Sequence, residues 1–150
     1  MSAEKPFQAV PETIQWKLHF RSSPERVYEA LATDAGRRQY WAESAAETDG
    51  RLHYVFLNGV EDIGTVLERV PGRKFKVTYF NWTVTFELAA DGATGTDMTM
   101  TCVGVPESSK EEITAGWVSW LMAMKAAVDF QVDLRNHDPE RTWFSGYADN

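Results

Sequence analysis

One stretch constrains the fold more than any other, the apolar run over residues 113–130 near the end of the chain. Apolar residues recur there three and four positions apart, which is the spacing of one face of an amphipathic helix. The residues on this face are Ile113, Trp117, Trp120, Leu121, Met124 and Val128. A helix with so broad an apolar face must cover other apolar surface, and we predict that it packs on a β-sheet.

Alternation of apolar and polar residues predicts the strands of that sheet. Residues 13–20 alternate as a half-buried strand does, which places His19 on the outer, polar face. The dipeptide Asn58-Gly59 suits a two-residue type I′ hairpin turn, so it predicts a hairpin of strands 51–57 and 60–70. Further strands are expected over residues 73–80, over 82–88 and around Met98 to Cys102.

Capping signals predict where the helices begin. Ser22 to Glu25 combines serine caps with a proline in the first turn, so a helix should follow the first strand. Thr33-Asp34 predicts a second short helix through Tyr40-Trp41, a pair that we interpret as an apolar plug against the sheet. Before the long helix, Ser108 and Ser109 each precede a glutamate by three positions, the pattern of a capping box.

The sequence predicts that the long helix ends at the segment Asn136 to Pro139. Beyond it, the tail carries Trp143, Phe144 and Tyr147, which favour docking of the tail on the body. We expect one domain over residues 1–150, with a loose arm at 1–12 and a docked or flexible tail at 138–150.

Charge and composition exclude several functions. The net charge of −7 repels phosphate backbones and anionic head groups, so we expect neither nucleic acid nor membrane as a partner. The first residues lack the apolar core of a signal peptide, and no run approaches the roughly 20 apolar residues that cross a bilayer. Together with a single cysteine, Cys102, which we interpret as a buried hydrophobe, this predicts a cytoplasmic protein.

No motif for metal, cofactor or catalysis stands out. The three histidines are scattered, and the chain lacks a phosphate-binding glycine loop, a nucleophile elbow and a CxxC pair. Glu61-Asp62 are adjacent, so their side chains diverge on a strand and are interpreted as solvated charge. We therefore predict no metal, no cofactor and no catalytic residue, and we favour a non-enzymatic protein.

Several stretches resemble a known family. Residues 23–31 followed by Tyr40-Trp41, and Gly116-Trp117 followed by Leu121 and Lys125, resemble the START/SRPBCC (Bet v 1-like) superfamily, in particular its activator of heat-shock protein 90 ATPase-like branch. The resemblance spans residues 13–134. It implies an α+β helix-grip fold, in which a curved antiparallel seven-stranded sheet surrounds a long C-terminal helix, with two short helices after the first strand. It also implies a cavity that takes an apolar small molecule in many relatives.

From the residues, the space between sheet and helix can be either an open pocket or a filled core, since large rings and methionines suit both. If it is open, we expect it to be lined by apolar and aromatic residues of both elements and a few polar groups. The predicted lining residues are Trp16, Tyr54, Phe75, Tyr79, Asn81, Trp82, Phe86, Met98, Met100, Trp117, Trp120, Leu121 and Met124, with Ser119 or Lys125 as further polar groups.

The predicted function is binding or carriage of an apolar or aromatic small molecule. Two alternatives remain: a polyketide cyclase-like enzyme that uses a pocket tyrosine or carboxylate, and an interaction protein that acts on a chaperone ATPase, as the branch name implies. The sequence leaves the oligomeric state open, and a homodimer is among the states it allows.

Overall fold

The structure is a computed structural model that describes residues 10–150, so most of the predicted N-terminal arm lies outside the described residues. Seven strands, three α-helices and two short 3-10 helices follow one another along the described chain. In order, they are β1 (Thr13–Phe20), α1 (Pro24–Ala32), α2 (Asp34–Arg37), β2 (Ser44–Thr48), β3 (Arg51–Val55), β4 (Glu61–Val70), β5 (Lys74–Tyr79), β6 (Trp82–Asp91), β7 (Gly95–Val103), η2 (Glu107–Ser109), α3 (Lys110–Phe130) and η3 (Trp143–Ser145).

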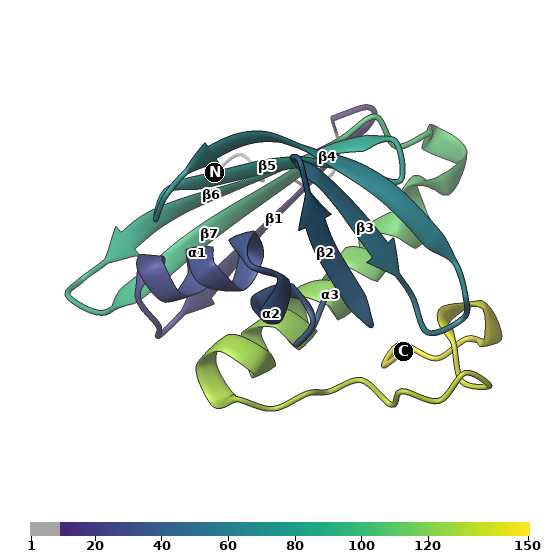
Figure 1. The fold of residues 1–150 in the computed structure, drawn as a ribbon. Coiled ribbons are helices and arrows are strands. Elements are labelled where there is room, and N and C mark those ends of the chain that lie inside the picture. The colour runs from purple at the N-terminus through teal and green to yellow at the C-terminus, as the bar shows by residue number, and fades with distance from the viewer. Residues whose placement is uncertain (1–9) are drawn as a thin grey trace, which may run out of the picture.

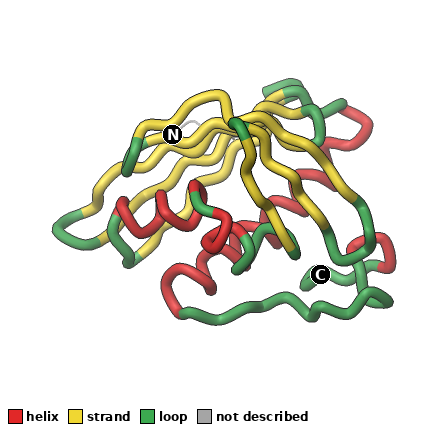
Figure 2. Tube along the Cα trace, viewed as in Figure 1, coloured by secondary structure: helices red, strands yellow, loops and turns green. Residues whose placement is uncertain are grey.

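The strands form one antiparallel sheet in the order β1-β7-β6-β5-β4-β3-β2. Figure 1 shows the sheet curved over α3, while α1 and α2 close the same side near β1 and β2. The segment after α3 runs back along the outer side of that helix as a loop (Figure 2). The predicted α+β helix-grip fold is confirmed.

The core lies between the concave face of the sheet and α3. In β1 the predicted alternation holds, because Ile14, Leu18 and Phe20 are buried and His19 is exposed. In α3 the inward face is also as predicted, with Trp117, Leu121 and Met124 all buried. Burial of such large side chains stabilises the fold by about 1.5–3 kcal/mol each relative to exposure, so this layer dominates its stability.

Two details of the hairpins differ from the sequence prediction. The hairpin around Asn58-Gly59 exists, but its loop is longer than two residues because the Phe56 amide bonds to the Val60 carbonyl. Gly59 has a positive φ of 83° and Asn58 does not, whereas a type I′ turn needs both. That turn geometry occurs instead at Asp49-Gly50, with φ of 50° and 77°, which joins β3 to the unpredicted strand β2.

The helix starts are partly as predicted. Ser23 caps α1 by accepting a hydrogen bond from the Arg26 amide at 3.3 Å, and Thr33 caps α2. However, α2 ends at Arg37, before Tyr40. The prediction of a capping box at α3 is wrong. Ser109 has helical φ and ψ of −109° and −4° and makes no side-chain cap bond, because η2 leads directly into the helix. A capping side chain needs an extended cap residue.

The end of α3 was also predicted too late. The helix stops at Phe130 because Gln131 takes the left-handed conformation at φ 53°, and its amide bonds back to Ala126 and Ala127. Left-handed C-caps usually use glycine, so glutamine gave no signal. The residues after Gln131 are therefore free to run as an extended segment toward the open end of the sheet.

Candidate functional site

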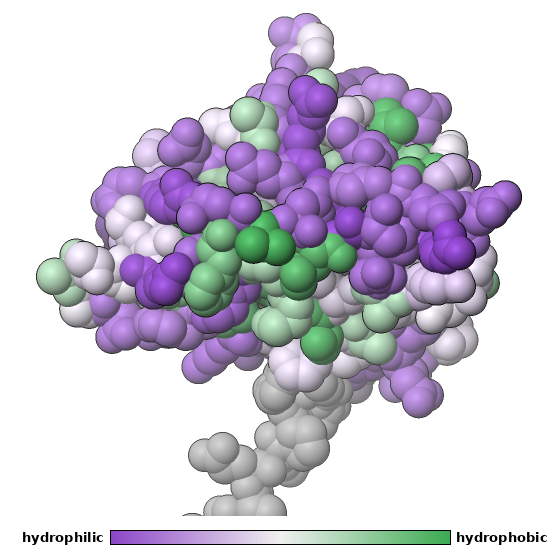
Figure 3. All heavy atoms as spheres, turned by 90° about the horizontal axis from the view of Figure 1, so that it is seen from below, coloured by the Kyte–Doolittle hydropathy of each residue, from purple (hydrophilic) through white to green (hydrophobic). Residues whose placement is uncertain are grey.

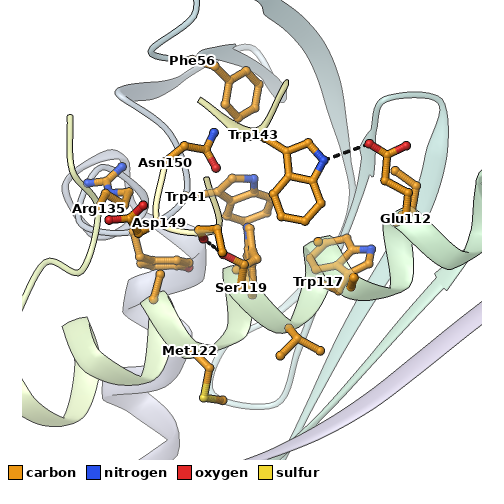
Figure 4. A pocket seen from close by; sticks show the side chains of 18 of the residues that line it. Trp41, Phe56, Glu112, Trp117, Ser119, Met122, Arg135, Trp143, Asp149 and Asn150 are labelled. Carbon is orange, nitrogen blue, oxygen red and sulfur yellow. Dashed lines mark hydrogen bonds between the residues drawn. The ribbon is translucent and has the colours of Figure 1, made fainter. Parts of the chain in front are cut away.

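A pocket of about 660 Å³ lies at the end of the sheet where β3, β4, β5 and β6 turn. Its walls come from α3, from the β3–β4 and β5–β6 turns, from the Tyr40-Trp41 segment and from the C-terminal segment, residues 131–150. Figure 4 shows side chains from these elements converging, with Trp41 and Trp143 near the centre and Trp117 on α3. The pocket thus joins parts of the chain that are far apart in sequence.

The C-terminal segment forms its outer wall through defined contacts. The Trp143 indole donates to Glu112 at 3.0 Å, and its ring lies 3.7 Å from where a Cβ on Gly116 would be. The Ser119 hydroxyl donates to the Ala148 carbonyl, one turn further along α3. The ring beside Gly116 is therefore that of Trp143.

A polar clamp holds the start of the C-terminal segment. The Arg135 guanidinium donates to the Ala42 carbonyl at 2.9 Å and to the Arg38 carbonyl at 2.6 Å, and it pairs with Asp133 at 3.0 Å. His137 contacts Asp133 and Glu43, both at 2.7 Å, through its two ring nitrogens. These contacts tie the segment to the loop that carries Trp41. Because the Arg135 guanidinium already binds these three partners, it is not available to pair with an anionic group in the pocket.

Aromatic rings close the inner side of the pocket. Trp41, Tyr79 and Trp120 line it, and buried Phe86 packs behind them. Trp41 lies 5.0 Å from Trp120 and 5.6 Å from Tyr79, and Phe86 stacks on Trp120 at 5.3 Å between ring centroids. Contacts of this kind add about 0.5–1.5 kcal/mol each beyond burial. The middle of the space between sheet and helix is therefore filled by rings, and the pocket lies beside this filled part.

Burial shapes the chemistry of the tyrosines. Burial raises the pKa of Tyr79 and of Tyr54, so both stay neutral phenols at physiological pH. Burial likewise raises the pKa of Cys102 to about 12, which keeps its thiol protonated and unreactive. Tyr79 therefore presents an uncharged hydroxyl group in the pocket wall.

The predicted lining residues divide into three groups. Tyr79, Trp82, Trp117 and Trp120 line the pocket. Two others do not line it: half-buried Trp16, whose indole donates to the Thr114 carbonyl at 3.4 Å, and exposed Asn81, which lies between the lining residues Phe80 and Trp82. The remaining seven are buried in the core and do not line the pocket: Tyr54, Phe75, Phe86, Met98, Met100, Leu121 and Met124.

Sequence reasoning did not include the C-terminal segment in the site. Trp143, Phe144 and Asp149 of this segment line the pocket. Trp143 and Phe144 were expected to dock on the body of the fold, but Phe144 remains 77% exposed. Lys125, proposed as a polar group, points elsewhere: its ammonium donates to the His19 carbonyl and lies 3.8 Å from Asp129. The aromatic content of the tail was the signal that could have placed it at the site.

One cluster elsewhere has metal-type side chains. His19, Asp91 and Asp97 lie together on the outer face of the sheet, where His19 contacts Asp97 at 2.9 Å. All three are exposed, and within residues 10–150 no other group of this kind occurs. The contact is that of a cross-strand pair between β1 and β7.

The face that α3 and the C-terminal segment form is partly apolar, and Figure 3 shows apolar side chains gathered in its middle. Val118 and Met122, one turn apart on α3, are 40% and 44% exposed. No helix in the described part of the chain is long and apolar enough to cross a lipid bilayer.

These features define a helix-grip domain of the START/SRPBCC class, with its pocket at the open end of the grip. The chain belongs to the family described as Activator of Hsp90 ATPase homolog 1-like protein, whose model matches residues 21–129. A search of curated proteins finds no match.

Solved structures with the same fold include a Staphylococcus saprophyticus protein, 18% identical, with a TM-score of 0.71 over 82% of this chain and 96% of that one. The Aha1 dimer from Colwellia psychrerythraea is 19% identical, with a TM-score of 0.70 over 79% of this chain and 96% of that one. DynU16, from the dynemicin biosynthetic locus, is 16% identical with a TM-score of 0.67, over 81% of this chain and 49% of that one. At these identities the likeness concerns the fold.

Proposed function

We propose that the chain binds an apolar or aromatic small molecule in this pocket and acts as a binding or carrier protein. The observation that carries the proposal is a pocket of about 660 Å³ whose wall includes Trp41, Trp82, Trp117 and Trp143. That volume lies in the range of small-molecule sites, which are mostly apolar with a few polar groups. Aromatic faces on several sides favour a flat ligand.

Polar groups lie toward the rim. Glu112 and Asn58 are exposed lining residues, and Ser119 is half-buried with its hydroxyl bonded to Ala148. Such an arrangement supports an amphipathic or wholly apolar ligand whose flat part contacts the rings. The absence of a nucleophile and base pair among the lining residues, all of which belong to the described chain, supports binding without chemistry.

The test is a screen of aromatic small molecules by thermal shift, with hits checked by native mass spectrometry. We expect one-to-one complexes whose affinity falls about tenfold or more in Trp143→Ala, because that ring forms the outer wall. Phe130→Ala is the matched control, since Phe130 is 52% exposed and does not line the pocket. Hits that bind both variants equally would contradict this site.

Tyr79 supports a second candidate, an enzyme of the polyketide cyclase type. Its phenol lines the pocket and stays protonated, so it could polarise a ligand carbonyl. The likeness to a protein of a biosynthetic locus is compatible with this role. Conversion of a bound polyketide-like substrate that is lost in Tyr79→Phe would favour the enzyme, and unchanged turnover would remove Tyr79 from that role.

The family description supports a third candidate, an interaction that stimulates a chaperone ATPase. The exposed apolar side chains of Val118 and Met122 would be the contact surface on α3. An Hsp90 ATPase assay tests it: stimulation that Met122→Glu abolishes would favour this role, and an unchanged ATPase rate would exclude it.

A further inference from the structure

Four buried polar atoms lack a hydrogen-bond partner among the residues that the structure describes. They are the indole nitrogens of Trp41, Trp117 and Trp120 and the hydroxyl of Tyr54. Folded proteins leave few such atoms unpaired, so a group of them calls for an explanation. All four belong to one network of neighbouring rings, in which Trp41 lies 5.4 Å from Tyr54 and Trp120 lies 5.0 Å from Trp117.

The unpaired atoms are donors. An indole N–H donates and does not accept, and burial keeps Tyr54 a protonated phenol. Trp117 has the Cys102 sulfur as a polar neighbour, without a bond of normal geometry. Trp120 is packed among rings, with Tyr40 at 5.2 Å and Trp41 at 5.0 Å. Trp41, Trp117 and Trp120 all line the pocket. Since Trp41 has the Tyr79 hydroxyl and Trp117 has the Cys102 sulfur as a polar neighbour, Trp120 is the lining tryptophan whose N–H is left for a ligand acceptor.

The surrounding charges disfavour an anionic ligand. Glu112 and Asp149 place carboxylates among the lining residues, and the chain carries a net charge of −7. The one lining guanidinium, Arg135, is already bonded to Asp133 and to two backbone carbonyls. An acceptor without charge therefore matches the pocket better than a carboxylate or phosphate does.

We infer that the pocket takes an uncharged, planar aromatic molecule with a ketone-type acceptor, and that this acceptor receives the Trp120 indole N–H. The inference rests on the proposed function and adds the chemical class of the ligand. The indole nitrogens are closed to solvent in this structure. Binding therefore includes a small turn of the Trp120 ring or a shift of α3, which brings the N–H to the ligand.

The experiment compares three probes of one ring skeleton by equilibrium dialysis: fluorenone, fluorene, which lacks the acceptor, and fluorenone carboxylate, which adds a charge. We expect fluorenone to bind about tenfold more tightly than fluorene, a ratio that equals about 1.4 kcal/mol, and more tightly than the carboxylate. Equal affinities for fluorenone and fluorene would overturn the inference and leave the proposed function standing. No binding of any probe would overturn both.

Two variants locate the donor. In Trp120→Phe the preference for fluorenone over fluorene should fall to near one while fluorene still binds. Trp16→Phe is the matched control, because Trp16 does not line the pocket and its indole N–H donates to the Thr114 carbonyl at 3.4 Å. It should keep the preference. A preference that persists in Trp120→Phe, or disappears in Trp16→Phe, would overturn the assignment.

A measurement on the unaltered chain covers the case in which Trp120→Phe does not fold. The six tryptophans give six indole N–H signals in a nitrogen-15 NMR spectrum. Fluorenone should move the Trp120 indole proton downfield, as hydrogen bonding does, and fluorene should not. The same displacement with both probes, or none with fluorenone bound, would overturn the inference.

Discussion

At the residue scale, His137 links the C-terminal segment to the body of the fold. Its hydrogen bond with Asp133, and then its contact with Glu43, raise the pKa of His137 in the folded chain. Partial burial opposes ionisation of Asp133, but its hydrogen bonds from Arg135 and His137 lower its pKa to about 2. The protonated imidazole therefore bridges two carboxylates, which a neutral ring with a single N–H cannot do.

The pH dependence follows from these directions. The stabilisation from His137 is complete below its unfolded pKa of about 6.5 and is lost as pH rises through the raised folded pKa. The contribution of Asp133 is present above its unfolded pKa of about 3.9 and is lost as pH falls toward 2. We predict that Asp133→Asn moves the pKa of His137 down toward 6.5, as measured by NMR titration of the imidazole.

Glu43→Gln is the control for that titration. Glu43 contributes less to the raised pKa of His137 than Asp133 does, so its loss should shift the titration less. A His137 that already titrates at or below its ordinary pKa in the unaltered chain would show that the clamp does not form.

Arg37 is a fully buried cation. Its guanidinium donates to the carbonyls of Leu31 at 2.9 Å and Ala45 at 3.0 Å, and it pairs with Asp34 at 2.6 Å. We predict that Arg37→Met lowers the free energy of unfolding by about 3 kcal/mol, because it leaves buried carbonyls without donors. Urea denaturation followed by circular dichroism measures this.

The exposed neighbour of Arg37 provides a control of matched chemistry. Arg38→Met should change the free energy of unfolding by about 0.5 kcal/mol or less, as expected for an exposed position. Equal losses in the two variants would mean that the buried hydrogen bonds of Arg37 do not matter.

At the element scale, α3 and the C-terminal segment meet at Gly116. A Cβ built there would lie 3.7 Å from the Trp143 ring, which is ordinary contact. We predict that Gly116→Ala raises the free energy of unfolding by about 0.5–1 kcal/mol, because alanine favours the helix and nothing must move. Thermal or urea unfolding measures the gain.

A larger side chain at the same position should act differently. Gly116→Leu is expected to displace Trp143 and release the C-terminal segment, which limited proteolysis would detect. In a Trp143→Ala background the leucine should be tolerated. If Gly116→Ala destabilises the chain, the packing of α3 against the segment differs from that described above.

Elements with strong periodicity could be predicted, and weak or irregular ones could not. β1 and α3 each bury one apolar face, so the residues that their sequence periodicity places on that face are the ones buried in the structure. β2 was missed because Ala45 is its one fully buried residue and the strand offers no alternation of large side chains. Its signal was the turn at Asp49-Gly50, which has the positive φ angles that such turns require.

At the scale of the whole molecule, the fold followed from the sequence better than the site did. The order of strands and helices predicts the helix-grip fold. It does not determine whether aromatic side chains fill the space between the sheet and α3. Packing of Trp41, Phe86 and Trp120 fills its middle and leaves the pocket at the end. The outer wall comes from a segment without periodicity, whose path depends on long-range contacts such as that of Arg135 with Ala42.

The central claim is that this pocket holds a flat aromatic molecule, and nuclear Overhauser contacts test it most directly. With fluorenone bound to isotope-labelled protein, we predict contacts from ligand protons to Trp117, Trp120 and Trp143, which line the pocket from two elements. Contacts confined to residues elsewhere, such as the outer face of the sheet around His19, or none at saturating ligand, would contradict the account.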